Sequence, residues 1–257
     1  LANGFDVAKT FDGTNIANLG GTPPVYPFIR FHGDRLWIAG DNEVRYTAIN
    51  VDNSWPAAQA LNISDPKGSR TRFMLSYNGM LIIGKEGGLF RFRGSPVLGG
   101  DLNLFSSIGC DAGYTADVTE FGIVFKSRDG LYITDGFDVA PFSDKIRTLF
   151  TGVFAGAVGK YYPKNRQYWF SFPTTGAVNN TTWVGTIIEH PKGRRVAWHK
   201  YDGFAIDSIA IWDGGGDAGE IYYGRADNGL VRRADTTNQD LTTDYTCRIQ
   251  SHHHTHG

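Results

Sequence analysis

One strand–turn–strand phrase recurs along this chain, and its spacing constrains the fold more than any other feature of the sequence. The phrase reads FHGDRLWIAG at 31–40, SYNGMLIIG at 76–84 and TEFGIVFKS at 119–127. The turn glycines of these copies are Gly33, Gly79 and Gly122, which are 46 and 43 residues apart. Self-similarity at such a period is typical of folds in which each repeat forms one small antiparallel sheet. The period therefore predicts an all-β chain, a β-propeller.

Later copies of the phrase extend the pattern to most of the chain. YPKNRQYWFS at 162–171 places Asn165 in the turn, and a last copy runs from Ile209 through a glycine loop to Gly224. We predict one propeller domain over 1–250, with five or six blades of short antiparallel strands. The blades are expected at about 28–56, 71–95, 113–142, 156–203 and 205–236. The segments 3–19 and 242–250 are expected to share a closing blade, because closure removes open sheet edges.

The composition agrees with short strands and tight turns. Of 257 residues, 41% are hydrophobic and 14% aromatic, and 33 are glycine, whereas only two are methionine. A net charge of −1 gives no global basic field that attracts nucleic acid or an anionic membrane. The sequence has no run of eighteen apolar residues, so we expect no membrane span.

Local signals predict the connecting segments. Asp12–Gly13 between apolar residues indicates a hairpin whose central residues both take positive φ. The segments 50–70 and 96–112 are predicted to be irregular loops. One short helix is expected at 143–150, with Ser143 as its cap and with Ile146, Leu149 and Phe150 on one face.

The two ends of the chain and its cysteines give further expectations. The chain begins at Leu1 within strand-like sequence and ends in a His-rich tail at 251–257, so we expect a piece of a longer polypeptide. Cys110 and Cys247 are too few for a disulfide framework, and two buried thiols are favoured over one bridge.

Two clusters have residue types that bind metals, and each has a simpler explanation. The tail histidines are His252, His253, His254 and His256. Imidazole is a common metal ligand, but a tail lacks the separated ligands and supporting hydrogen bonds of a specific site. The carboxylates of 213–220 faintly resemble a calcium loop, although their spacing fits no established one. We therefore predict no metal and no cofactor.

Catalytic patterns are weak in this sequence. Asp41, Glu86, Asp129 and Asp227 fall near inner strand ends, where propeller hydrolases place paired carboxylates, but surface turns also collect aspartate. The chain has no Gly-x-Ser-x-Gly, Walker, His-Glu-x-x-His or Cys-x-x-Cys motif. We therefore expect a protein that is not an enzyme.

Basic residues form modest clusters that point weakly to a phosphate-bearing or acidic partner. They are Arg70, Arg72, Arg91, Arg93, Lys192, Arg194, Arg195, Arg232 and Arg233. Arg91 and Arg93 alternate with phenylalanines, as in a strand with one solvated face. Solvated strand faces and ion pairs are the simpler interpretation, and DNA contact stays open.

The order of several phrases resembles a known group of proteins. The phrases are NGFD and FDGT at 3–14, FHGDRLWIAG at 31–40, GLYITD at 130–135, FSDKI at 142–146, YYPKNRQYW at 161–169 and WHKYDGF at 198–204. Together they resemble the β-propeller domain of tailed-bacteriophage virion structural proteins, of the tail-nozzle or packaged-DNA-stabilising type. The resemblance covers nearly the whole chain, is specific for the propeller, and implies no catalytic residues.

The resemblance implies a structural subunit of a phage tail or head-to-tail connector, assembled in the host cytoplasm and located in the virion. Its expected partners are copies of itself and other virion proteins, docked by the loops 50–70, 94–112 and 174–182. Trp55, Phe105 and Trp183 are candidate interface anchors, since aromatic residues dominate well-packed interfaces, and each is equally compatible with a place in the core. Two alternatives remain open: a secreted ligand- or carbohydrate-binding propeller, and a propeller glycoside hydrolase.

Overall fold

The chain forms two compact units, each of which is described by itself. The computed structural model describes residues 1–152, 154, 156–190, 193–201, 204–212, 219–234, 239–240 and 243–244. Unit 1 is Leu1–Ala155 and unit 2 is Gly156–Gly257. The His-rich tail, Cys247, most of the 213–220 loop and the strand expected at 245–249 lie outside the described residues.

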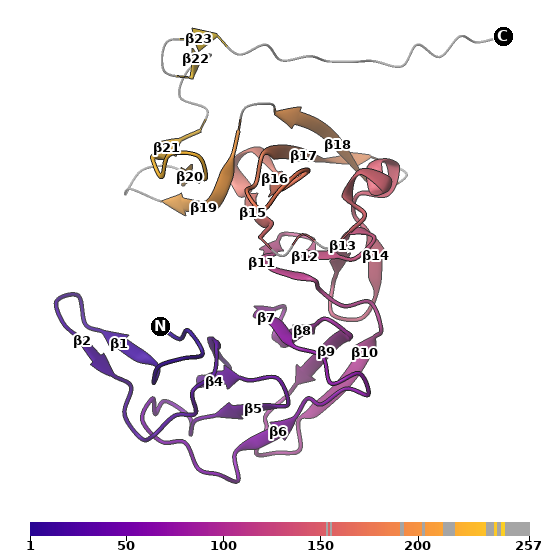
Figure 1. The fold of residues 1–257 in the computed structure, drawn as a ribbon. Coiled ribbons are helices and arrows are strands. Elements are labelled where there is room, and N and C mark those ends of the chain that lie inside the picture. The colour runs from indigo at the N-terminus through magenta and orange to yellow at the C-terminus, as the bar shows by residue number, and fades with distance from the viewer. Residues whose placement is uncertain are drawn as a thin grey trace. The chain divides into compact units, whose positions relative to one another are not determined.

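Unit 1 consists of a hairpin and three four-stranded antiparallel sheets (Figure 1). The hairpin is β1 (Lys9–Phe11) and β2 (Ile16–Asn18). Blade 1 is β3 (Phe28–His32), β4 (Arg35–Ala39), β5 (Glu43–Tyr46) and β6 (Ala60–Asn62). Blade 2 is β7 (Thr71–Tyr77), β8 (Met80–Lys85), β9 (Gly88–Arg93) and β10 (Asp101–Ser106). Blade 3 is β11 (Ala112–Thr119), β12 (Gly122–Ser127), β13 (Gly130–Thr134) and β14 (Val139–Pro141).

Unit 2 continues the same architecture in the order of the chain. Blade 4 is β15 (Val158–Tyr162), β16 (Gln167–Phe172), β17 (Thr181–His190) and β18 (Gly193–Tyr201). Blade 5 has three strands, β19 (Ile206–Trp212), β20 (Glu220–Arg225) and β21 (Val231–Arg233). A short pair, β22 (Gln239–Asp240) and β23 (Thr243–Asp244), follows it.

The predicted fold class, an all-β chain of β-propeller blades, is confirmed. Successive strands pair antiparallel with their neighbours in the chain, and each group of strands closes into its own small sheet. The bounds differ in two blades, because β6 and β10 lie in segments predicted to be irregular. Both are outer strands with no fully buried residue, so their sequences carry little of the apolar signal that marks a core strand. The prediction of one domain over 1–250 stays a prediction.

The turn residues agree with the predicted hairpins in part. Gly33 with Asp34 and Asn78 with Gly79 form two-residue turns in which both residues have positive φ. Gly122 instead begins β12, where it pairs with Thr119. Its φ is +146°, and a Cβ there would lie 2.4 Å from a backbone oxygen of the next strand, so both the backbone conformation and the available space require glycine.

Two further turns differ in detail from the prediction. The loop at Asp12–Gly13 has four residues, and only Gly13 takes a positive φ, while the Asp12 carboxylate accepts the N–H groups of Thr14 and Asn15. Asn165 lies in the turn as expected, within the 3₁₀ helix η2 (Pro163–Asn165), and Arg166 takes the left-handed conformation.

The predicted helix is a kinked 3₁₀ helix, η1 (Asp144–Phe150), interrupted at Ile146. Ser143 precedes it but does not cap it, because its Oγ accepts the backbone N–H of Leu131 in β13 at 3.1 Å. Phe150 is fully buried, whereas Leu149 is half exposed, so the predicted apolar face is wrong at Leu149.

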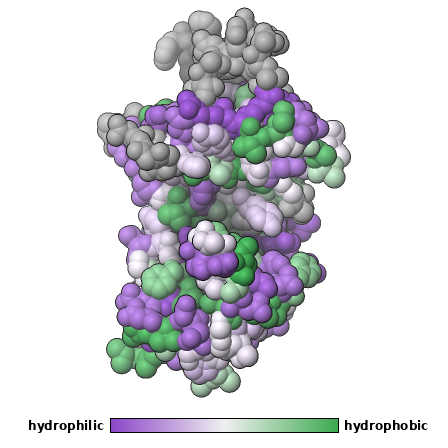
Figure 2. Space-filling model, turned by 90° about the vertical axis from the view of Figure 1, so that its left-hand side faces the viewer, coloured by the Kyte–Doolittle hydropathy of each residue, from purple (hydrophilic) through white to green (hydrophobic). Residues whose placement is uncertain are grey.

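Neighbouring blades of unit 1 pack through shared apolar clusters. The cluster of blades 1 and 2 includes Trp37, Leu81 and Phe92, and that of blades 2 and 3 includes Phe73 and Phe125. In unit 2, the cluster around Trp169 joins blades 4 and 5. The face shown in Figure 2 carries apolar side chains in small groups among polar ones. No described helix combines the length and apolar composition that a membrane crossing requires.

Close backbone approach between blades 2 and 3 makes Gly113 a sensitive position. A Cβ at Gly113 in β11 would lie 2.0 Å from the carbonyl oxygen of Arg72 in β7, so one strand would have to move. We expect Gly113→Ala to lower the free energy of unfolding of unit 1 by about 1–3 kcal/mol, as overpacking does. Urea unfolding, followed by hydrogen exchange of peptides from blades 2 and 3, measures this.

Gly156→Ala in unit 2 is the control for this substitution. The nearest atom to a Cβ at Gly156 is the Ala177 oxygen at 3.9 Å, an ordinary contact. A Gly113→Ala protein that unfolds at the wild-type urea concentration would contradict the close packing of β7 and β11.

Candidate functional site

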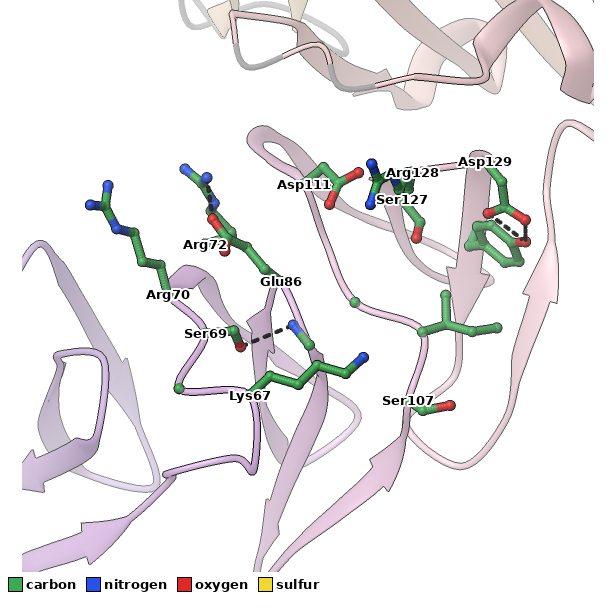
Figure 3. Close-up of a pocket in the computed structure, with 15 residues that line it drawn as sticks. Lys67, Ser69, Arg70, Arg72, Glu86, Ser107, Asp111, Ser127, Arg128 and Asp129 are labelled. Atoms are coloured by element: carbon green, nitrogen blue, oxygen red, sulfur yellow. Dashed lines mark hydrogen bonds and ion pairs between the residues drawn. The ribbon is translucent and has the colours of Figure 1, made fainter.

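An open cavity of about 810 Å³ lies between blades 2 and 3 at one end of their strands (Figure 3). Its walls come from the loop 67–70, the β8–β9 turn at 86–87, the loop 107–111 and the β12–β13 turn at 127–129. All of these segments belong to unit 1. Turns at the same end of consecutive blades converge here because each blade repeats the same up-and-down strand order.

The cavity is lined by charged side chains of both signs. The basic lining residues are Lys67, Arg70, Arg72 and Arg128, and the acidic ones are Glu86, Asp111 and Asp129. Glu86 forms an ion pair with Arg72 across blade 2. Asp129 is paired with Arg147 of η1 and accepts the hydroxyl of Tyr132 at 2.9 Å. Two of the three carboxylates, Glu86 and Asp129, therefore already form ion pairs with arginines.

Asp111 differs from the other two carboxylates. Burial raises the pKa of its carboxyl, while the nearby charges of Lys126 and Arg128 act in the opposite direction. Its Oδ2 atom is buried without a hydrogen-bond partner, and the same is true of Arg72 Nε. Figure 3 shows Asp111 and Arg128 on the blade 3 side of the cavity.

The structure brings together only two of the four carboxylates considered as catalytic candidates. Glu86 and Asp129 line the cavity in corresponding turns of blades 2 and 3. Asp41 occupies the corresponding turn of blade 1, where its Oδ1 accepts the backbone N–H of Thr71 at 2.9 Å. Asp227 lies in unit 2 and is bound by Arg225, whose hydrogen bond lowers the pKa of the carboxyl.

The three candidate interface anchors occupy different environments. Trp55 is buried and packs with Ala8 and Ile38, so it has the core role that its sequence also allowed. Phe105 is half-buried in β10. The guanidinium carbon of Arg91 lies 5.5 Å from the centroid of the Phe105 ring. Trp183 is half-buried in β17. Docking through Phe105 and Trp183 stays a prediction.

The prediction that Arg91 lies on a solvated strand face is wrong. Arg91 is buried, and its Nη1 donates to the carbonyl oxygen of Gly136 in blade 3 at 2.8 Å. Its guanidinium also lies 4.7 Å from the ring centroid of Phe137. Sequence alternation missed this role because the partners of Arg91 lie about one repeat further along the chain. Arg93, Arg194, Arg195 and Arg233 are exposed, in agreement with the simpler interpretation.

Cys110 is a free, fully buried thiol, as expected for one of the two cysteines. Burial raises its pKa to about 12, which disfavours the reactive thiolate.

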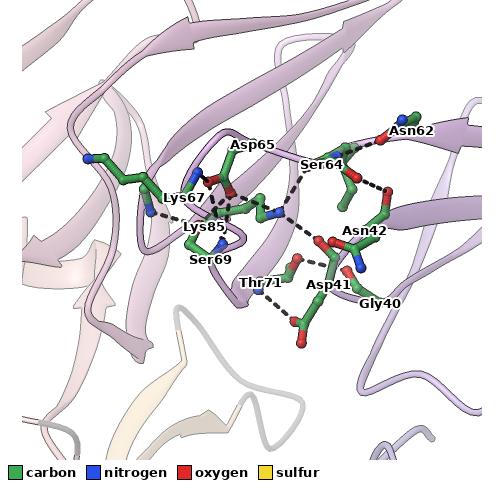
Figure 4. A network of polar contacts seen from close by, with 12 residues as sticks. Gly40, Asp41, Asn42, Asn62, Ser64, Asp65, Lys67, Ser69, Thr71 and Lys85 are labelled. Atoms are coloured by element: carbon green, nitrogen blue, oxygen red, sulfur yellow. Dashed lines mark hydrogen bonds and ion pairs between the residues drawn. The ribbon is translucent and has the colours of Figure 1, made fainter.

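A buried ion pair fixes the loop that forms one wall of the cavity (Figure 4). Lys85, the last residue of β8, is fully buried, and its Nζ lies 3.0 Å from Asp65 Oδ2. Its Nζ also donates to the carbonyl oxygens of Asp41 at 2.6 Å and Ile63 at 2.9 Å. Sequence analysis gave no signal for this network, because a lysine at a strand end is usually solvated.

Ser69 connects this network to the cavity. Its hydroxyl donates to Asp65 Oδ2 at 2.5 Å and accepts the backbone N–H of Gly87 at 3.0 Å. Ser69 and Gly87 both line the cavity, so the ion pair and the β8–β9 turn hold its wall in place.

Because of the Asp65–Lys85 pair, we predict that the stability of unit 1 falls at acid pH. Burial alone would raise the pKa of Asp65, but hydrogen bonds from Ser69, Lys85 and two backbone N–H groups lower it from 3.8 to about 2. Between pH 4 and 2 the unfolded chain therefore binds more protons at this site than the folded one. We expect unit 1 to lose roughly 2 kcal/mol of stability from Asp65 as the pH falls through this range. Urea unfolding at several pH values, followed by hydrogen exchange of β8, measures this loss.

Asp65→Asn should remove this part of the pH dependence. It should also lower stability at neutral pH by about 3–5 kcal/mol, because Lys85 is left as a buried charge without its carboxylate. Asp138→Asn, at an exposed position of blade 3, is the matched control. If the free energy of unfolding of the Asp65→Asn protein still fell between pH 4 and 2 as steeply as that of the wild type, Asp65 would not be the titrating group.

Within the described ranges, no group of three or more His, Cys, Asp or Glu side chains is placed to hold a metal ion.

Comparison with known proteins gave structural neighbours alone. No family model and no curated protein matches the chain. Among solved structures, the chain is similar to a chain of the S. cerevisiae complex of Dbp5 with Nup159, Gle1, IP6 and ADP, with a TM-score of 0.46 and 8% identity over 80% of this chain and 59% of that one. It is also similar to the N-terminal domain of Nup159, with a TM-score of 0.44 and 8% identity over 82% of this chain and 62% of that one. The chain thus spans less than two thirds of either neighbour, and the fold assignment rests on its own sheets.

Proposed function

We propose that this chain is a non-enzymatic structural subunit of a tailed-phage virion, a propeller of the tail or head-to-tail connector that docks copies of itself and other virion proteins. The phage part of this proposal is supported by the sequence phrases described above. The docking part is supported by the surface of blade 2.

The observation that carries the docking role is the β9–β10 turn at 94–100. Val97 is 63% exposed and Leu98 is 87% exposed at its tip. The Ser95 carbonyl oxygen accepts the backbone N–H groups of Leu98 at 3.1 Å and Gly100 at 2.8 Å, so the turn is held in one conformation. A preorganised apolar tip loses little conformational entropy when a partner covers it.

The other segments expected to dock also present apolar side chains. Val51 is exposed in the segment 50–70, and Val178 is exposed in the segment 174–182 of unit 2. Val97 and Leu98 belong to the segment 94–112. Each of the three predicted docking segments therefore offers apolar surface for a partner.

A second copy of this chain is the occupant that we propose for the β9–β10 tip. The net charge of −1 leaves little repulsion between copies, and proteins near zero net charge associate readily. Under this proposal, repeated contacts of this kind assemble copies of the chain into part of a virion tail or connector.

Replacing Val97 and Leu98 together by serine tests this proposal. Burying one leucine contributes about 1.5–3 kcal/mol, so the loss of both side chains should weaken self-association by at least about tenfold. Sedimentation velocity over a range of protein concentrations measures the shift toward smaller species.

Leu149→Ser is the matched control, since Leu149 is half exposed on η1 and lies outside the three docking segments. Equal association of the double-serine protein and the wild type would refute docking through the tip. The phage assignment has its own test: it would be wrong if the reading frame had no portal or tail genes beside it.

A further inference from the structure

The β13–β14 turn of blade 3, at 135–138, presents an exposed aromatic side chain beside the apolar tip of blade 2. This turn and the β9–β10 turn each follow the third strand of a blade, so they lie at the same end of neighbouring blades. Phe137 is 53% exposed. The guanidinium carbon of Arg93, the last residue before the β9–β10 turn, lies 5.6 Å from the centroid of the Phe137 ring. Phe137 therefore extends the surface formed by Val97 and Leu98 onto a second blade.

The Phe137 ring and the turn that carries it are both held in place. The buried guanidinium of Arg91 lies 4.7 Å from the centroid of the ring and donates to the carbonyl oxygen of Gly136 at 2.8 Å. The backbone N–H of Phe137 donates to Asp135 Oδ1 at 2.8 Å, and that of Gly136 donates to Thr134 Oγ1 at 3.0 Å. An aromatic side chain that is ordered before a partner binds loses little conformational entropy when it is covered.

The base of the β9–β10 turn carries one charge of each sign. Arg93 and Asp101 flank the turn, and Arg93 Nη2 lies 3.4 Å from Asp101 Oδ2. Both side chains are exposed, and an exposed ion pair contributes little to stability, so its members can change partners at little cost. If two copies meet about a two-fold axis, Arg93 of each copy can pair with Asp101 of the other. The surface is therefore complementary to itself, as a two-fold contact requires.

From these contacts we infer that Phe137 is an anchor of a two-fold contact between copies of this chain, an inference that rests on the proposed docking role. Val97, Leu98 and Phe137 form the apolar part of the contact, and Arg93 and Asp101 exchange partners across the axis. A second copy matches both charges, whereas an acidic or a basic partner would match only one of them. A two-fold contact closes on itself, so it joins subunits in pairs, and other surfaces extend the assembly.

Phe137→Ser tests the anchor by sedimentation velocity of the full chain over a range of concentrations. We expect self-association to weaken at least about tenfold, because aromatic anchors carry much of the binding energy of an interface. Tyr114→Ser is the matched control, since Tyr114 is an exposed aromatic residue of the same blade, in β11. If the Val97 and Leu98 double-serine protein were weakened but Phe137→Ser were not, this inference would fail and docking through the tip would stand. A wild-type chain that does not self-associate would refute both.

Charge reversal tests the two-fold arrangement. Arg93→Asp places two acidic side chains at the base of the turn, and Asp101→Arg places two basic ones there, so each variant alone should self-associate at least about tenfold more weakly than the wild type. In an equimolar mixture, every acidic side chain of one variant faces a basic one of the other across the axis. We expect the mixture to associate within about twofold of the wild type. A mixture that associates as weakly as either variant alone, or single variants that associate as the wild type does, would overturn the two-fold contact.

Discussion

The buried ammonium of Lys85 is the interaction on which the geometry of unit 1 depends most. A charge that is removed from water must be paired and hydrogen-bonded, or it costs several kcal/mol. Lys85 belongs to blade 2, yet its partners Asp41, Ile63 and Asp65 come from blade 1 and the loop that follows it. The Lys85 side chain therefore holds blades 1 and 2 together. It also positions the loop that carries Lys67 and Ser69 into the cavity.

Blade 3 has a second buried lysine that plays a comparable part. Lys126 of β12 donates to the carbonyl oxygens of Ser127 and, at 2.8 Å, of Gly152. Burial lowers the pKa of Lys126 to about 8, although the nearby charge of Asp111 acts to raise it. The ammonium binds the segment after η1 to the β12–β13 turn, so both sides of the cavity are supported by a lysine from the second strand of a blade. Loops at this end of unit 1 are thus held by buried charge as well as by apolar packing.

The sequence predicted features that depend on neighbouring residues and missed those that depend on the next blade. Gly79 and the alternation around β8 predict a hairpin, because turn geometry and strand pairing are decided within about ten residues. Lys85 and Arg91 look like solvated strand residues, since the carbonyl oxygens of Ile63 and Gly136 to which they donate lie 22 and 45 residues away in the chain. The cavity was missed for the same reason. Glu86 and Asp129 were noted as strand-end carboxylates, but only the structure shows that they share one wall with Asp111.

The apolar β9–β10 tip and the charged cavity lie at opposite ends of one strand. β9 begins beside the cavity at Gly88 and ends at Arg93, where the apolar β9–β10 turn follows. Six strand residues span roughly 20 Å, so the tip and the cavity have no side chain in common. Their chemistry also differs, because the tip is apolar and the cavity is charged. A neighbouring copy seated on the tip therefore leaves the cavity of the same blade free.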